Sequence, residues 1–471
     1  MNLSESCFAH RLKNSLQTRP DMYKKPLATC LQWCFLLVAL VLVSSCPVSA
    51  WSEHPLLAYP VLSPLPGLAQ REGIPVKSLK TFLLEEEAGL ESLLENQEAW
   101  SREHLTHYAP RPETLAFRAT GNPDDVLKRF FHAIRINPNS QMRLYLHLLP
   151  GESPSGKEEV SPRTLTTLSD TSEMHGTRYV ELVEGELVSP LQVLCTANDE
   201  PDFGLDLGLF EDNGTDYGAL YGFGNQPFGN PNLEYSSQAP FHMGFYHESP
   251  LVFFFGPFLQ ETYPEYRIHL YKSLSDYAFQ SGQDYWGWRF MGWAMHYLGD
   301  LSMPYHASVL PGVSPTRMIW TNLKAMLGMP QSRDDAIQIV SNRHTVMEKF
   351  QQEVLRRAHR EHSEDHPFFQ ALKNPVEMIH YTDDFPRQVA ASQAAAAAER
   401  TDAVLERWMP PRLVADPGFE VSGSAEMSDL VASVAEQGGD EAIDQITVAI
   451  AEQLRHYSMH LRSFYAACMV E

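Results

Sequence analysis

Cysteine is scarce in this sequence, and most of it lies near the start of the chain. Of the six cysteines among 471 residues, four fall within residues 1–50, which leaves Cys195 and Cys468 for the rest. Two cysteines form at most one disulfide and are too few for a thiolate metal site. The sequence therefore excludes a disulfide-stapled scaffold, and the protein must be stabilised by its core, by metal, or by both.

Positive charge is scarce as well. The chain has 36 Lys and Arg against 59 Asp and Glu, a net charge of −23. Without residues 1–50 it has 31 basic and 57 acidic residues, a net charge of −26. Such a field repels polyanions, so we expect no nucleic-acid partner and no steering toward strongly anionic bilayers. It suits metal cations and neutral or zwitterionic substrates.

The sequence shows no convincing membrane span, because the apolar run "CFLLVALVLVSS" is too short. Lys24 and Lys25 precede this run, and "CPVSA" follows it, with small residues at the positions that a signal peptidase requires. We therefore expect residues 1–50 to be a signal peptide, with Met22 as a possible true start, and a secreted or periplasmic protein. An alternative is lipoprotein processing at Cys46, since "LVSSC" places that residue after small ones.

Internal repeats and dinucleotide motifs are also absent, and the glycine-rich "GFGNQPFGNP" opens no strand-to-helix unit of a phosphate loop. Apolar residues at helical spacing predict a mainly α fold. We expect a β-hairpin over 177–194, a mobile excursion over 150–180, and a long structured loop over 200–250. The expected helices cover 76–106, 122–136, 266–283, 285–300, 333–359, 383–408 and 439–469.

The stretch "WAMHYLGDLSMPYHAS" carries the first candidate metal ligands. His296 and Asp300 stand four residues apart, which places both on one face of a helix. Their neighbours are large and apolar, so the pair is expected to be buried and to need a partner or a metal. Pro304 ends the helix, and His306 can turn back toward the same cavity.

A second pair at the same spacing, His344 and Glu348, lies in "NRHTVMEKF". One such pair by itself is typical of a surface hydrogen bond. Two pairs, one of them in an apolar helix with a third histidine nearby, favour a metal site. Histidine with carboxylate and no thiolate suits zinc.

Further candidates lie upstream, in "NDEPDFGLD" and "APFHMGFYHES". Among the four acids of the first, Asp202 is preferred over Asp206; in the second, His242 is preferred over His247. Each can also be a solvated loop charge or a packed histidine. If they converge, clustered zinc ions lower the pKa of bound water to about 7 and hold the oxygens of a phosphodiester, which indicates phosphoester hydrolysis.

The stretch "HYLGDLSMPYH" resembles the core motif of the zinc-dependent bacterial phospholipases C, whose superfamily includes fungal single-strand-specific zinc nucleases. The resemblance implies a single multi-helix domain over 51–471 with three zinc ions in a cleft. In this family the mature chain begins with a tryptophan whose amine and carbonyl oxygen bind zinc. Trp51 directly follows "VSA", which is why we favour cleavage after Ala50 over lipidation at Cys46.

The family's ligands carry over residue by residue. His296, Asp300 and His306 match the central motif, and Glu348 resembles the phospholipases, because the nucleases have Asp there. The longer gap between Asp202 and His242, with expected insertions at about 150–190 and 205–240, implies a divergent, larger branch. The implied metal ligands are Trp51, His54, Asp202, His242, His296, Asp300, His306, His344 and Glu348.

The resemblance implies cleavage of a phosphatidylcholine-like lipid to diacylglycerol and a phosphorylated head group. Asp202 would take or orient the proton of the attacking water. We expect a monomer acting at a membrane surface, with the aromatic residues of 241–255 forming either a lipid-accepting rim or core. The alternatives are a zinc nuclease of the same fold and a non-catalytic, zinc-stabilised surface binding protein.

Overall fold

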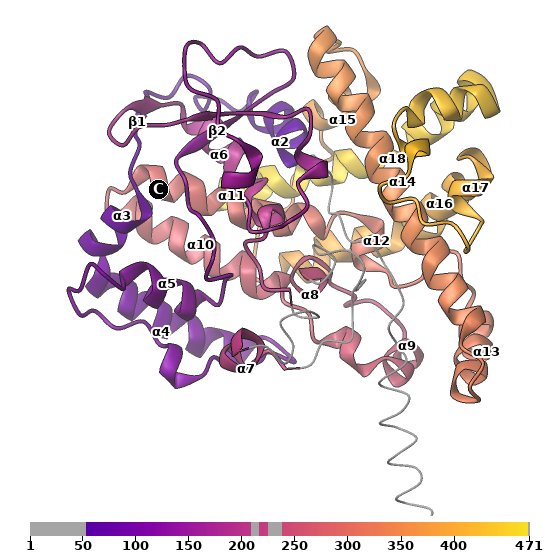
Figure 1. The fold of residues 1–471 in the computed structure, drawn as a ribbon, viewed down its shortest axis with the longest axis horizontal. Helices are drawn as coiled ribbons and strands as arrows, with labels where there is room; N and C mark the ends of the chain where they lie inside the picture. The colour runs from indigo at the N-terminus through magenta and orange to yellow at the C-terminus, as the bar shows by residue number, and fades with distance from the viewer. Residues whose placement is uncertain (1–52, 209–215, 225–237, 470–471) are drawn as a thin grey trace, which may run out of the picture. The chain divides into compact units, whose positions relative to one another are not determined.

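The computed structural model describes residues 53–208, 216–224 and 238–469 (Figure 1). Trp51, the expected signal peptide and much of the expected insertion at 205–240 lie outside these residues. The described chain is mainly helical, as the sequence predicts, and contains no helix that is long and apolar enough to cross a bilayer.

The α-helices are spread over the whole described chain. Those of the first half are α2 (His54–Leu62), α3 (Leu79–Glu85), α4 (Glu87–His104), α5 (Val126–Ile134), α6 (Pro190–Ala197), α7 (Asp216–Tyr221), α8 (Ala239–His242) and α9 (Pro250–Phe255). Those of the second half are α10 (Pro264–Gln280), α11 (Asp284–Asp300), α12 (Pro304–Ala307), α13 (Pro315–Met326), α14 (Gln331–Glu361), α15 (Pro367–Lys373), α16 (Ser392–Trp408), α17 (Pro411–Val414) and α18 (Leu430–Cys468). A π-helical turn, Pro386–Ala391, precedes α16.

Helix α11 lies at the centre of the core. Every residue from Tyr285 to Asp300 is buried, as expected for a helix that is apolar on all sides. It packs against α6, α10 and α18. The approach to α6 is close at Gly292, where an added Cβ would lie 2.6 Å from Ala197 Cβ and 2.7 Å from the carbonyl oxygen of Leu194. This packing fixes the position of the helix end that carries His296 and Asp300.

The strands of the described residues form two small antiparallel sheets, and the predicted hairpin over 177–194 is wrong. The two strands in this region pair with strands earlier in the chain instead of with each other, and the last part of the region begins α6, with Pro190 in the first turn, where proline is tolerated. The pairs are β2 (Tyr145–Leu148) with β3 (Arg178–Glu181), and β1 (Ile74–Pro75) with β4 (Leu187–Val188).

The excursion at 150–180 folds around a small core of its own. Two 3-10 turns, Pro162–Thr164 and Ser172–Met174, interrupt its irregular course. One residue of this core is Phe203, the last residue of the 3-10 turn η4 (Glu200–Phe203), so the excursion supports the turn that carries Asp202. The core consists of Tyr145, Leu165, Met174, Tyr179 and Phe203.

Helix α18 carries a histidine that is buried without being a metal candidate. His460 is fully buried, and its Nδ1 and Nε2 lie 2.7 Å from Ser302 Oγ and 2.9 Å from Gln393 Oε1. Burial, together with the charge of His456, lowers the pKa of His460 from near 6.5 to about 3. His460 therefore stays neutral in the folded protein at pH values between about 3 and 6.5, where the same histidine is protonated in the unfolded chain.

This difference makes stability depend on pH. The unfolded chain binds the extra proton below about pH 6.5, so the stability from neutral His460 is complete above that pH and falls as the pH drops toward 3. We expect the depressed pKa of His460 to lower the free energy of unfolding by about 2 kcal/mol at about pH 5 relative to about pH 8. In His460→Gln the loss of stability on acidification should be smaller by that amount, as measured by urea unfolding at both pH values. Equal pH dependence in the two proteins would contradict the assignment.

Candidate metal centre

The C-terminal end of α11 brings two predicted ligands into the core. His296 and Asp300 are one turn apart and fully buried, with His296 Nε2 3.3 Å from Asp300 Oδ2. The helix ends at Asp300, and the short helix α12 follows from Pro304, so that His306 is buried nearby. Local helical spacing thus accounts for His296 and Asp300, and the helix break before Pro304 accounts for His306, as the sequence predicts.

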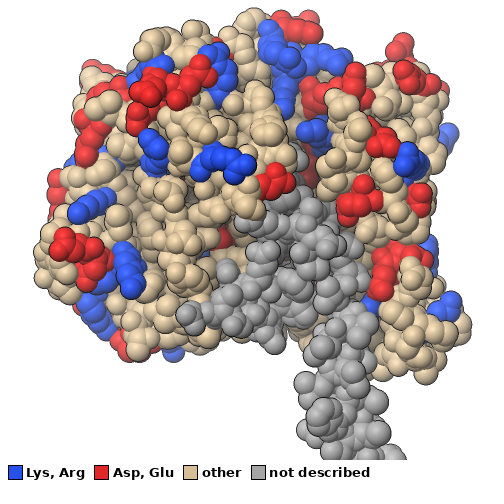
Figure 2. Space-filling view, viewed as in Figure 1, with Lys and Arg blue, Asp and Glu red and all other residues tan. Residues whose placement is uncertain are grey.

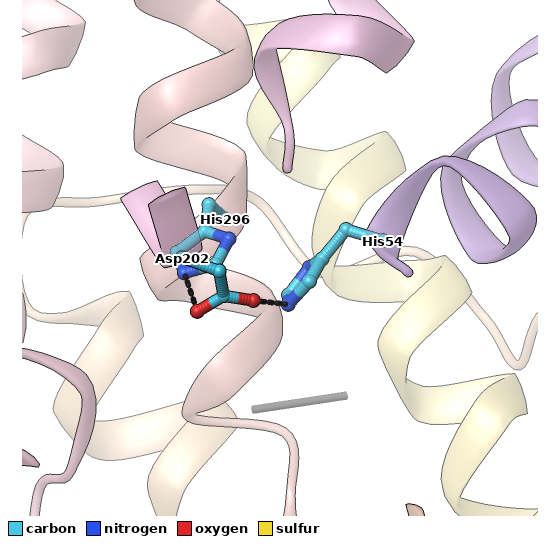
Figure 3. A group of neighbouring side chains, drawn as sticks. All are labelled: His54, Asp202 and His296. Atoms are coloured by element: carbon cyan, nitrogen blue, oxygen red, sulfur yellow. Dashed lines mark ion pairs between the residues drawn. The ribbon is translucent and has the colours of Figure 1, made fainter. Parts of the chain in front are cut away.

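Two residues from distant parts of the chain join this pair (Figure 3). His54, on the first turn of α2, and Asp202, on η4, lie beside His296, with the Asp202 carboxylate between the two imidazoles. The Asp202 oxygens are 3.7 Å from His54 Nε2 and 3.5 Å from His296 Nε2. His54 Nε2 also lies 3.5 Å from Asp300 Oδ1. The backbone N–H of His54 donates to Asp199 Oδ1 at 3.0 Å, which fixes the start of α2 against this site.

His242, the last residue of α8, completes a group that we call the His296 cluster. Its Nδ1 lies 2.8 Å from Asp300 Oδ2 and 3.1 Å from His296 Nε2. Asp300 is therefore in contact with imidazoles from α2, α8 and α11. The cluster consists of His54, Asp202, His242, His296 and Asp300.

A second group, the His344 cluster, consists of His306, His344 and Glu348. Their ligand atoms lie within 4.8 Å of one another, and all three residues are buried. His344 and Glu348 are one turn apart on α14, with Nε2 and Oε1 2.8 Å apart. His306 Nδ1 donates to the carbonyl oxygen of His242 at 3.1 Å, which connects the two clusters. The structure thus brings together every predicted ligand that lies within its described residues.

The geometry of both clusters suits a divalent metal ion. A tetrahedral zinc ion with bonds of about 2.0–2.2 Å holds its ligand atoms about 3.4 Å apart, close to the separations in the His296 cluster. In the described part of the chain, the buried Nε2 of His54 and Oδ1 of Asp300 have no hydrogen-bond partner, which is costly unless an ion binds them. Several of these His, Asp and Glu groups can therefore hold a metal ion.

The orientation of the imidazoles supports the same conclusion. His296 Nδ1 donates to the carbonyl oxygen of Asn198 at 2.8 Å, and His306 Nδ1 makes the corresponding bond to His242. A ligand histidine commonly donates its second N–H to a carbonyl, which fixes the tautomer and turns the other nitrogen toward the metal. Both residues have this arrangement, with Nε2 as the ligand atom.

Charge in the His296 cluster is set by burial and by close neighbours. Burial, with the charge of His242, lowers the pKa of His54 to about 3, and burial with the charge of His54 lowers that of His296 well below its ordinary value. Burial opposes protonation of His242, but its hydrogen bond to Asp300 together with the charges of Asp300, Asp202 and Asp206 outweighs this and raises the pKa to about 9. Partial burial and the nearby Asp300 carboxylate raise the pKa of Asp202. Because metal ligands must be unprotonated, His54 and His296 are in the ligand form at neutral pH.

The two alternative ligands lie outside the clusters. His247 is exposed, and its Nε2 bonds to the carbonyl oxygen of Arg387 at 2.7 Å. Asp206 is buried behind His242, 3.6 Å from its Nε2, and forms an ion pair of 2.5 Å with Arg267. The hydroxyl of Tyr297 also donates to Asp206, at 2.6 Å. Asp206 thus supports the site from behind, while Asp202 and His242 belong to the cluster.

Sequence reasoning did not identify the residues that position the ligands, although Asp199 is one of the four candidate acids of "NDEPDFGLD". Asn198 and Asp199 hold His296 and His54 through their backbone and side-chain oxygens, and Asp199 Oδ2 lies 3.4 Å from Nδ1 of the buried His147. Glu53 forms an ion pair with Arg356 on α14, and its side chain accepts a hydrogen bond from Thr177. Only the closeness of Asn198 and Asp199 to Asp202 in the sequence could have indicated them.

Comparison with known proteins adds no relative to this picture. No protein-family model, curated protein or solved structure matches the chain. Function therefore has to be inferred from the chemistry of the site itself.

Proposed function

We propose that this protein is an exported, zinc-dependent phospholipase C that acts on phosphatidylcholine-like lipids. The observation that carries the proposal is the convergence of five His and Asp side chains from four separate segments beside a second His and Glu cluster. This donor set suits zinc, and paired or clustered zinc ions suit the hydrolysis of phosphodiesters. The motif resemblance of residues 296–306 and the choice of Glu at 348 favour a phospholipase.

Exposure distinguishes one member of the His296 cluster. The Asp202 side chain is 31% exposed, whereas those of His54, His242, His296 and Asp300 are at most 4% exposed. We therefore propose that a substrate phosphate approaches the cluster beside Asp202. The buried members are in place to bind metal, and Asp202 is in place to contact substrate and solvent as well.

These positions assign roles to the residues. The His344 cluster would hold one of three proposed zinc ions, and the His296 cluster with the amine of Trp51 would hold the other two. Bound zinc supplies an activated water and neutralises negative charge on the phosphate oxygens. Asp202 would accept or orient the proton of the attacking water, and the His296 and His306 bonds to backbone carbonyls hold their rings in orientation.

Product analysis tests the proposal. The zinc-loaded protein is expected to release diacylglycerol and phosphocholine from phosphatidylcholine, to stop on addition of chelator, and to recover with zinc. Asp202→Asn should lower the rate by about 10²–10⁴-fold. Because His54, His242, His296 and Asp300 remain in the cluster, most of the zinc should stay bound.

Two other outcomes would replace the proposal. Degradation of single-stranded DNA in place of lipid, measured with and without chelator, would identify a nuclease. Full zinc binding without hydrolysis of any phosphodiester tested would identify a non-catalytic binding protein.

A further inference from the structure

Helix α13 presents an apolar face to solvent. Trp320 and Leu323 on α13 are 60% and 42% exposed, and Leu327, which directly follows the helix, is 76% exposed. Their spacing places the three side chains on one side of the helix. The opposite side is buried through Met318 and Thr321. An exposed group of large apolar side chains on a protein surface commonly marks an interaction site.

Helix α9 also exposes a large apolar side chain, and it contributes to the same small core as α13. Phe254 is 73% exposed, and Figure 1 shows α9 and α13 as neighbours at the lower right. A small hydrophobic core, separate from the main one, joins the two helices through Val252 and Met318 and also includes Met243, next to His242. We call the exposed set the α9–α13 surface; it consists of Phe254, Trp320, Leu323, Met326, Leu327 and Met329.

The charge around this surface differs from that of the rest of the chain. Residues 301–333 contain no Asp or Glu, although the chain has 59 of them, and they include Arg317 and Lys324 on the exposed side of α13. Neither of these two side chains forms an ion pair among the described residues. Lys324 Nζ lies 5.5 Å from the centre of the Trp320 ring. Figure 2 shows the end of the molecule where α13 lies mostly in tan.

We propose that the α9–α13 surface docks the protein onto a phospholipid bilayer. Trp320, Leu323, Leu327 and Phe254 enter the boundary between head groups and acyl chains, and Arg317 and Lys324 contact lipid phosphates. The inference rests on the proposed function for the identity of the partner. Because the small core beneath the surface includes Met243, beside His242, docking would bring lipid to the side of the protein that carries this ligand.

A second copy of the chain fits this surface less well. In a two-fold dimer the same patch faces itself, so the Arg317 and Lys324 side chains of both copies would enter one interface to which residues 301–333 contribute no Asp or Glu. A stable interface also buries about 800 Å² per partner over some 20–30 residues, many more than the six apolar residues of this surface. A bilayer needs only a few inserted side chains and attracts the basic ones.

Vesicle binding tests the proposal apart from catalysis. All proteins in this test carry Asp202→Asn, so that they do not hydrolyse the vesicle lipid, and all are loaded with zinc. Each protein is sedimented with phosphatidylcholine vesicles that either contain or lack phosphatidylglycerol. Combined Trp320→Ser, Leu323→Ser and Leu327→Ser changes should lower binding by at least about tenfold. Arg317→Gln with Lys324→Gln should lower binding chiefly to the vesicles that contain phosphatidylglycerol.

A matched control uses exposed apolar residues elsewhere. Val183, Leu187 and Val448 are 68%, 71% and 66% exposed, and their combined change to Ser should leave binding unchanged. A second comparison uses the α13 triple variant, Trp320→Ser with Leu323→Ser and Leu327→Ser, with Asp202 intact. It should hydrolyse a monomeric short-chain lipid at the wild-type rate, and vesicle lipid at least about tenfold more slowly than the wild type does. The single change Trp320→Ser provides the same comparison if the triple variant does not fold.

Clear outcomes would overturn the inference. If the α13 variants bound vesicles as well as the wild type does, the inference would be wrong. It would also be wrong if the wild type formed a dimer and the α13 variants lost the dimer but kept vesicle binding. Vesicle binding that depends on α13, in a protein that hydrolyses no lipid, would support the docking surface and refute the proposed function.

Discussion

Asp300→Asn is expected to lower the rate of phospholipid hydrolysis by about a thousandfold and to reduce bound zinc. Its carboxylate lies 2.8 Å from His242, 3.3 Å from His296 and 3.5 Å from His54, so a single change weakens the contact with three imidazoles. Asparagine keeps the shape but removes the negative charge that balances a divalent ion. Zinc content by mass spectrometry and initial rates on short-chain phosphatidylcholine measure the two effects.

A carboxylate in a surface ion pair provides the control. Asp276 on α10 pairs with Lys272 at 2.7 Å, four residues earlier, and its side chain is 31% exposed. Asp276→Asn should leave zinc content and rate unchanged. If Asp300→Asn retained full zinc and a rate within a few-fold of wild type, the His296 cluster would not be the catalytic metal site.

Arg267→Met is expected to lower the free energy of unfolding by about 3–5 kcal/mol. The ion pair with Asp206 is fully buried, and removal of Arg267 leaves the carboxylate in the core without its partner charge. Arg267 also donates to the carbonyl oxygens of Ile134 and Arg135, at 2.6 and 2.8 Å, at the C-terminal end of α5. Urea unfolding followed by circular dichroism, with zinc saturating in both proteins, measures the loss.

Two further variants separate the buried charge from the loss of packing. Arg267→Met combined with Asp206→Leu removes both charges and should recover part of the stability. Arg400 forms an exposed pair with Glu452, so Arg400→Met should change stability by less than about 1 kcal/mol. A loss for Arg267→Met as small as that for Arg400→Met would contradict the importance of the buried pair.

The helical part of the site was predictable because its information is local. His296 and Asp300, and His344 and Glu348, each lie one turn apart on long helices, α11 and α14, whose apolar spacing is plain in the sequence. The sequence also predicts that His306 returns to the site after Pro304. Spacing along a helix is enough to place these side chains together.

Other features depend on contacts between distant segments. The choice of Asp202 over Asp206 follows from Arg267, which pairs with Asp206, and the choice of His242 over His247 follows from the exposed position of His247. The predicted hairpin was wrong because each strand found its partner upstream. Helices as short as α8 and α9 contain too few residues to show a period, so proline near their starts was the available signal.

The contact between α6 and α11 has a consequence for how metal preference can change. Asn198 follows α6; its side-chain amide donates to the carbonyl oxygen of Gly292 at 3.1 Å, and its own carbonyl accepts the Nδ1 proton of His296. The interhelical distance at Gly292 therefore sets the tilt of the His296 ring. A substitution at this packing glycine would therefore change the arrangement of nitrogen and oxygen atoms that the His296 cluster offers to a metal ion, with every candidate ligand left as it is.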